Sequence, residues 1–139
     1  MDTSETYIKM CEKAEEIECG HEWIDGDMFY EKLQSPQPGG YQEGVFLEYE
    51  DSEFGSHAKD TRYPREKLIW LPRQDQLQMM VQRSDEYARP FIARFAKWVH
   101  DEIDYVLDQS LKSMEQLWLA FAMKEKYNKI WNGEEWVNS

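Results

Sequence analysis

The stretch SMEQLWLAFAMKEKYNKIWNGEEW, residues 113–136, decides the fold because it holds the densest apolar run of the chain, residues 117–123. An apolar run of this length fits either a buried strand or a buried helix. Its flanks favour a helix: Ser113 and Gln116 have the spacing of a capping box, and two lysines follow the run, where the negative end of the helix dipole lies. A helix that is apolar on every side has to be surrounded by protein. We therefore expect this helix at the centre of the core.

Three further segments have apolar residues at every third or fourth position, which is typical of helices with one buried face. These segments are residues 4–18, 72–82 and 90–106. Thr3 or Ser4 can cap the first of them, and Gly20 has the residue type that ends helices. Pro72 suits the first turn of the second predicted helix, residues 72–82, because the backbone N–H that proline lacks would have no partner there.

Three short stretches have the composition of strands: residues 28–30, 45–49 and 67–71. After the central helix, Asn128 can adopt the left-handed conformation that ends helices. Asn132-Gly133 then fits a tight type I′ turn between residues 130–131 and 136–137. Together the patterns predict an α+β fold, with three or four helices packed around the central C-terminal helix and a small antiparallel sheet.

The composition predicts one domain, residues 1–139, in a reducing compartment. No apolar run approaches the roughly 18 residues of a membrane helix. The acidic, polar start is unlike a signal peptide. Cys11 and Cys19 would lie about 12 Å apart along a helix, which is too far for a disulfide. We therefore expect a cytoplasmic protein that does not enter the membrane.

The net charge of −12 lies entirely in the first 60 residues, which hold 16 Asp and Glu against four Lys. The remaining residues hold 12 acidic and 12 basic side chains. Two interpretations stay open: a solvated acidic surface that keeps the protein soluble, or an acidic face for a basic partner. Direct binding to nucleic acid is not expected, because phosphate contacts need Lys and Arg.

The residue spacing gives no support for a metal site or a catalytic centre. Cys19 and His21 could supply two zinc ligands, but no second pair follows at zinc-finger spacing. Asp25 and Asp27 could contact a divalent cation, but the pattern of a calcium-binding loop is absent. We therefore expect no metal, no cofactor and no catalytic residue, and an interaction protein in preference to an enzyme.

The segment LPRQDQLQ, residues 71–78, is polar and rich in amides at the start of the second predicted helix. Its side chains can cap the helix and bond to neighbouring backbone. Alternatively Arg73, Gln74 and Gln76 form a recognition patch, with Arg73 meeting a carboxylate or a phosphate. The tryptophans of WNGEEW, residues 131–136, present a similar choice between core packing and stacking on a base or sugar.

Four stretches resemble a family of small uncharacterised proteins encoded by bacteriophages and prophages. They are TYIKMCEKAEEI (6–17), LPRQDQLQ (71–78), SMEQLWLAFAMKEKY (113–127) and WNGEEW (131–136). Residues 21–66 cover the part that varies in that family, and Asn128 stands where relatives often have Gly. The resemblance implies a phage product in the cytoplasm of a bacterial host, and it supplies no catalytic residue.

The leading hypothesis is a non-enzymatic phage accessory protein that binds a basic surface of a host or phage protein, as an inhibitor or a nucleic-acid mimic. The candidate binding residues are Glu12, Glu15, Glu16, Glu48, Glu50, Asp51, Glu53, Arg73, Gln74 and Gln76. The alternative is a small-molecule or nucleotide-binding protein, or an enzyme, with a pocket formed by tryptophans and Arg73. The sequence leaves the oligomeric state open.

Overall fold

The computed structural model describes residues 1–31, 45–48, 68–103 and 111–139, and for residues 45–48 it describes the backbone alone. The helices are α1 Glu5–Lys13, α2 Glu15–Glu18, α3 Gln74–Val81, α4 Ala88–Trp98 with a π-helical continuation Val99–Ile103, and α5 Met114–Tyr127. The strands are β1 Met28–Glu31, β2 Val45–Glu48, β3 Leu68–Leu71, β4 Lys129–Trp131 and β5 Trp136–Asn138. This combination of helices and small antiparallel sheets confirms the predicted α+β fold.

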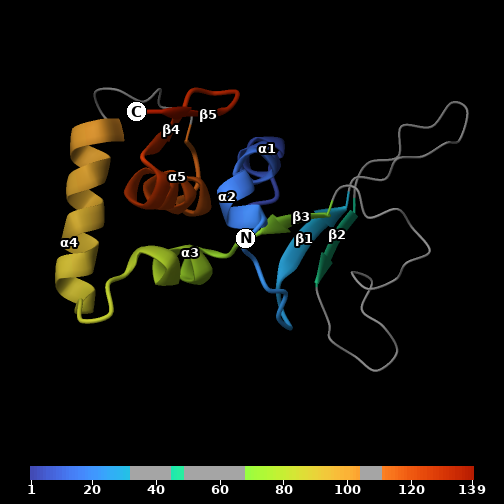
Figure 1. Cartoon of the computed structure of the whole chain (residues 1–139), viewed down its shortest axis with the longest axis horizontal. Helices are drawn as coiled ribbons and strands as arrows, with labels where there is room; N and C mark the ends of the chain where they lie inside the picture. Colours follow the sequence, from blue (N-terminus) through green and yellow to red (C-terminus); the bar gives the residue numbers. More distant parts are fainter. Residues whose placement is uncertain (32–44, 49–67, 104–110) are drawn as a thin grey trace, which may run out of the picture.

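The strands form two separate antiparallel sheets. The first has the order β2-β1-β3, and Phe29 of β1 lies between Leu47 of β2 and Trp70 of β3. The second is the hairpin of β4 and β5. Figure 1 shows α4 at one end of the molecule and the three-stranded sheet toward the other, with α5, α3 and α1 between them. Within the described part of the chain, every helix is too short or too polar to cross a bilayer.

Helix α5 begins and ends as its sequence predicts. Ser113 Oγ accepts the Gln116 N–H at 3.1 Å, and Asn128 ends the helix with φ 54° and ψ 43°. The reciprocal half of the expected capping box differs, because Gln116 Oε1 accepts the N–H of Lys112 at 2.9 Å. Residues 118–123 are all buried, and α5 contacts α3, α1 and β4. Its role as the organising centre of the core stays a prediction.

An aromatic interface, defined here as Phe91, Phe95, Trp98, Trp118 and Phe121, joins α4 to α5. The α4 members recur every third or fourth residue, so they share one face. Phe95 stacks on Trp118 with ring centroids 3.7 Å apart, and Trp98 tilts against Phe121 at 5.2 Å. These side chains are at most 9% exposed. The interface therefore supplies apolar burial through closely packed rings.

The first predicted helix is wrong as a continuous element. The chain breaks it at Ala14, which has φ −87° and ψ 62°, so α1 ends at Lys13 and α2 has four residues. Pro72 is likewise outside its predicted position, because α3 begins at Gln74 with Arg73 as N-cap. Pro72 instead accepts a hydrogen bond from Tyr7 Oη through its carbonyl, at 2.5 Å. This bond ties the start of α3 to α1.

The C-terminal hairpin forms as predicted, but its turn is not of type I′. Strand pairing ends at Trp131 and Trp136, which leaves residues 132–135 as the connection. A type I′ turn needs positive φ at both central residues, and Asn128 is the only described non-glycine residue with positive φ. Both tryptophans are buried, and Trp136 Nε1 donates to Met10 O at 2.9 Å. They therefore pack on the core.

Candidate functional site

The carboxyl group of Asp27 is fully buried, and this makes it the most unusual polar group of the described residues. Its Oδ2 lies 2.6 Å from His21 Nε2 and accepts the Ile24 N–H at 2.9 Å. Its Oδ1 accepts from Gln76 Nε2 at 2.6 Å. Burying a carboxyl group is costly unless hydrogen bonds replace its water. Three donors from two parts of the chain provide that replacement.

His21 is held from two directions. The bond to Asp27 fixes Nε2, and the ring lies flat on Trp70, with centroids 3.4 Å apart and planes at 8°. Trp23 contacts its edge at 5.2 Å. The hydrogen bond and the ring stacking together hold the His21 side chain in one orientation.

Glu18 of α2 lies against the same tryptophan. Its Oε2 accepts the Trp70 N–H at 3.1 Å, whereas its buried Oε1 has no hydrogen-bond partner among the described residues. Burial raises the pKa of Glu18 to about 8, and the charge of Glu12 adds to the increase. The Glu18 carboxyl is therefore protonated at neutral pH. We call Glu18, His21, Asp27, Trp70, Arg73 and Gln76 the Asp27 cluster.

Two of the residues predicted from sequence, Arg73 and Gln76, belong to the Asp27 cluster. Arg73 Nη1 donates to Gly26 O at 2.7 Å, and its Nε donates to Asp75 Oδ1 at 3.1 Å. Gln76 Oε1 accepts the Arg73 N–H at 2.9 Å. These contacts are of the kind expected if the polar side chains of residues 71–78 cap the helix and bond to neighbouring backbone. Gln74 makes no polar side-chain contact among the described residues.

The Asp27 cluster fixes the acidic loop, defined here as residues 20–27 between α2 and β1. The Asp27 N–H donates to Ile24 O at 3.1 Å, and the Ile24 N–H donates to the Asp27 carboxyl group. Gly26 lies in the turn between them and has φ 89°. On the outer side of this loop Glu22 and Asp25 are exposed, and Ile24 is 55% exposed. The loop therefore presents an apolar side chain between acidic ones on a fixed backbone.

The acidic residues of α1, α2 and the acidic loop differ in their exposure to solvent and in whether they form ion pairs. The first 31 residues hold ten Asp and Glu against two Lys, so they carry −8 of the total charge. Glu15 and Glu22 are exposed and form no ion pair within the described residues. Glu16 pairs with Lys129, and Glu12 is half-buried. The other predicted acidic positions lie outside the described residues: Glu50, Asp51, Glu53 and the side chain of Glu48.

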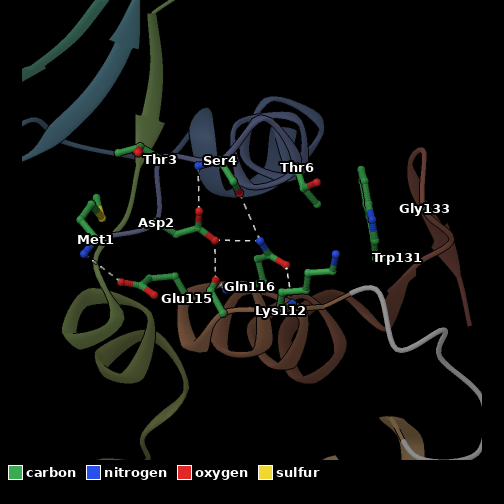
Figure 2. A pocket seen from close by; sticks show the side chains of 11 residues that line it. Met1, Asp2, Thr3, Ser4, Thr6, Lys112, Glu115, Gln116, Trp131 and Gly133 are labelled. Carbon is green, nitrogen blue, oxygen red and sulfur yellow. Dashed lines mark hydrogen bonds and ion pairs between the residues drawn. The ribbon is translucent and has the colours of Figure 1, made fainter.

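A pocket of about 890 Å³ lies between the N-terminal segment and the start of α5 (Figure 2). Asp2 organises its floor: its carboxylate accepts from Ser113 Oγ at 2.5 Å, Gln116 Nε2 at 2.7 Å and the Ser4 N–H at 2.8 Å. Burial opposes ionisation here, but these bonds together lower the pKa of Asp2. Trp131 forms part of the wall, and Arg73 does not line this pocket.

The other groups considered from sequence are not assembled into a metal site. Within the residues that the structure describes, no three His, Cys, Asp or Glu side chains converge on a point that could hold a metal ion. Cys19 is exposed, and both carboxyl oxygens of Asp27 are occupied. Cys11 is buried, and burial raises the pKa of its thiol well above the usual value.

Sequence reasoning did not find the Asp27 cluster. His21 and Asp27 are six residues apart across the Asp25-Gly26 turn, and Gln76 comes from a distant helix. The one available signal was an Asp directly after a turn and before a strand, a position where a side chain can bond back to the turn backbone.

No protein-family model matches the chain, and no curated protein or solved structure matches it significantly. The arguments about function therefore rest on the geometry above.

Proposed function

We propose that this chain is a non-enzymatic binding protein whose acidic N-terminal part holds a basic surface of another protein. The observation that carries the proposal is the acidic loop, which presents Ile24 between Glu22 and Asp25 on a backbone fixed by the Asp27 cluster. The resemblance to phage-encoded proteins supports an accessory role in the cytoplasm of a bacterial host. The partner is then a host or phage protein.

The acidic loop combines the features that protein recognition uses. Exposed carboxylates such as Glu15 and Glu22 attract a basic surface and speed the encounter. Ile24 provides apolar area at the centre of the contact, where burial contributes most to affinity. Because the loop is already ordered, binding costs little additional conformational entropy.

A basic groove that normally receives nucleic acid is a partner of the right charge. The first 31 residues have a formal charge of −8, and their exposed carboxylates, such as Glu15 and Glu22, match the potential of such a groove. Binding of this kind weakens as the salt concentration rises, because exposed charges are screened. An inhibitor that competes with nucleic acid would follow from this arrangement.

The test is affinity capture from host lysate at low and high salt, with the wild-type protein and two variants. Ile24→Ser removes the apolar centre of the acidic loop, and Ile92→Ser is the control, because Ile92 on α4 is similarly exposed at 51%. We expect a basic partner at low salt that Ile24→Ser loses and Ile92→Ser retains. A partner held equally by both variants, or one that is indifferent to salt, contradicts the proposal.

The pocket beside α5 favours a second candidate, a small-molecule or nucleotide-binding protein. Its volume of about 890 Å³ falls within the range of known ligand pockets. A bound ligand stabilises the folded state, so melting temperature would rise with ligand concentration. A screen of nucleotides and metal ions tests this, with Lys112→Ala as the variant that removes the ammonium group at the pocket. Unchanged melting throughout the screen excludes the tested ligands.

A further inference from the structure

The connection between β4 and β5 places two hydrogen-bond donors on one side-chain oxygen. Asn132 Oδ1 accepts the N–H of Glu134 at 2.8 Å and the N–H of Glu135 at 2.9 Å. Because both partners are donors, the atom between them has to be the amide oxygen, which fixes the orientation of the Asn132 side chain. The residue itself is exposed to solvent.

The next residue supplies an open nucleophile. The Gly133 N–H makes no hydrogen bond within the described part of the chain. Gly133 has φ 102°, and no atom outside the two adjacent residues lies within 4 Å of the position that a Cβ would occupy. The Gly133 nitrogen therefore has no hydrogen bond within the described residues that must break before it reacts.

We propose that Asn132 is a site of self-modification, at which this turn converts the asparagine to aspartate or isoaspartate with water as the only co-reactant. The Gly133 nitrogen gives its proton to water and forms a bond to Asn132 Cγ. The π electrons of the carbonyl move to Oδ1, which becomes an oxyanion. When the carbonyl re-forms, the bond from Cγ to Nδ2 breaks, and the nitrogen takes a proton and leaves as ammonia.

The product of this step is a cyclic succinimide, which one water molecule opens at either carbonyl to give aspartate or isoaspartate. Donors at 2.7–3.1 Å from a developing oxyanion lower the barrier of such a reaction. The N–H groups of Glu134 and Glu135 lie at that distance from Oδ1 before the reaction begins. The folded turn therefore already holds two donors on the oxygen that becomes the oxyanion, and we propose that they act as an oxyanion hole.

The modification acts on a loop that has two connections to the rest of the protein. Glu134 pairs with Lys9 of α1, and Figure 2 shows Gly133 and Trp131 on one side of the pocket. Isoaspartate routes the backbone through the side-chain carbon and lengthens the loop by one atom. It thus alters the wall of the pocket and the position of Glu134, which is a consequence separate from the proposed protein binding.

The chain contains two asparagines that serve as internal controls. Asn128 precedes Lys129 at the end of α5, and Asn138 precedes Ser139 at the end of β5. Neither has a glycine next to it, so a side chain shields the following nitrogen. The Asn132→Ala variant is the control for the assay, because it has no side-chain carbonyl carbon for the Gly133 nitrogen to attack.

The experiment incubates the full-length protein near neutral pH in heavy-oxygen water, in native buffer and in urea, and measures label at each asparagine by peptide mass spectrometry. We expect label at position 132 several-fold faster than at Asn128 and Asn138, none at position 132 in Asn132→Ala, and a faster reaction in native buffer than in urea. Equal rates at the three asparagines overturn the proposal. A reaction at Asn132 that is no faster in native buffer than in urea also overturns it, because unfolding removes the oxyanion hole.

Discussion

The aromatic interface and the Asp27 cluster hold the protein together in different ways. In the aromatic interface, α4 and α5 meet through stacked rings, such as Phe95 on Trp118 at 3.7 Å. In the Asp27 cluster, a buried carboxyl group is held by directed bonds from His21, Ile24 and Gln76. The first depends on filling space, and the second depends on donors, acceptors and protonation. The two regions should therefore respond differently to truncation, to isosteric substitution and to pH.

The largest expected effect is in the aromatic interface. Phe121→Ala removes a fully buried ring that contacts Phe95, Trp98 and Trp118. We expect the free energy of unfolding to fall by about 3–5 kcal/mol, from lost burial and from the cavity left behind. Chemical denaturation measures this, with Ile92→Ala on the exposed face of α4 as the control. A Phe121→Ala protein of near-normal stability would show that α5 is not the centre of the core.

A smaller effect is expected when Asp27 becomes Asn, because the shape is kept and only one acceptor is lost. The new NH2 group would face a donor, either Gln76 Nε2 at the Oδ1 position or the Ile24 N–H at the Oδ2 position. A buried unpaired donor costs roughly 1–3 kcal/mol. Thermal and chemical unfolding of Asp27→Asn should show this loss, while the exposed control Glu22→Gln should stay near wild type. Equal stability of the two variants would mean that the bonds to Asp27 contribute nothing net.

The Asp27 cluster should also make stability depend on pH through Glu18. The pKa of Glu18 is about 8 in the folded protein and lies above its ordinary value of 4.5, so the unfolded chain loses this proton at a lower pH than the folded protein. The contribution of the protonated Glu18 to the free energy of unfolding is therefore fully present below pH 4.5, and it is lost progressively as the pH rises toward 8. Glu18→Gln removes this dependence, because the amide stays neutral throughout.

The difference in the free energy of unfolding between Glu18→Gln and wild type should shift in favour of the variant by on the order of 1–2 kcal/mol when the pH is raised from mildly acidic to 8. This figure allows for the partial solvent access of Glu18. Urea denaturation across that pH range measures the difference. Glu16→Gln is the comparison, because Lys129 lowers the pKa of Glu16. A stability difference for Glu18→Gln that stays constant with pH would contradict the buried, protonated state of Glu18.

The smallest expected effect is that of Arg73→Ala. The variant loses the bond to Gly26 O and an exposed pair with Asp75, and such exposed pairs contribute little. We expect a loss of about 1 kcal/mol or less. Amide hydrogen exchange should be faster in the acidic loop than in wild type, whereas Arg89→Ala in the exposed first turn of α4 should leave the loop unchanged. Unchanged exchange in Arg73→Ala would mean that other bonds alone fix the loop.

The parts of the fold that local rules control were predictable. The Ser113 cap and the left-handed Asn128 follow from residue type and neighbours within one turn. The break at Ala14 carries no such signal, since alanine favours helix and neither glycine nor proline is adjacent. The connection between β4 and β5 also differs from the expected type I′ turn. The Asn132 side chain accepts hydrogen bonds from two backbone N–H groups, and strand pairing ends at Trp131 and Trp136.

The candidate site was predicted only in part. Arg73 and Gln76 stood out as polar residues at a helix start, but their partners come from the loop before β1. The composition indicated an acidic surface, and nothing in it separated the half-buried Glu18 from the exposed Glu15. Such differences depend on contacts between distant segments, which residue spacing does not encode.

The most direct test of the proposed function compares two pairs of charge reversals with the same change in net charge. Glu15→Lys with Glu22→Lys alters the exposed acidic residues of the N-terminal part, and Asp85→Lys with Glu135→Lys alters exposed positions elsewhere. Affinity for the captured partner is measured at low salt. We predict that the first pair weakens binding at least about tenfold, or about 1.4 kcal/mol, and that the second changes it little. Equal weakening by both pairs would show that only net charge matters and would contradict a recognition surface at the acidic loop.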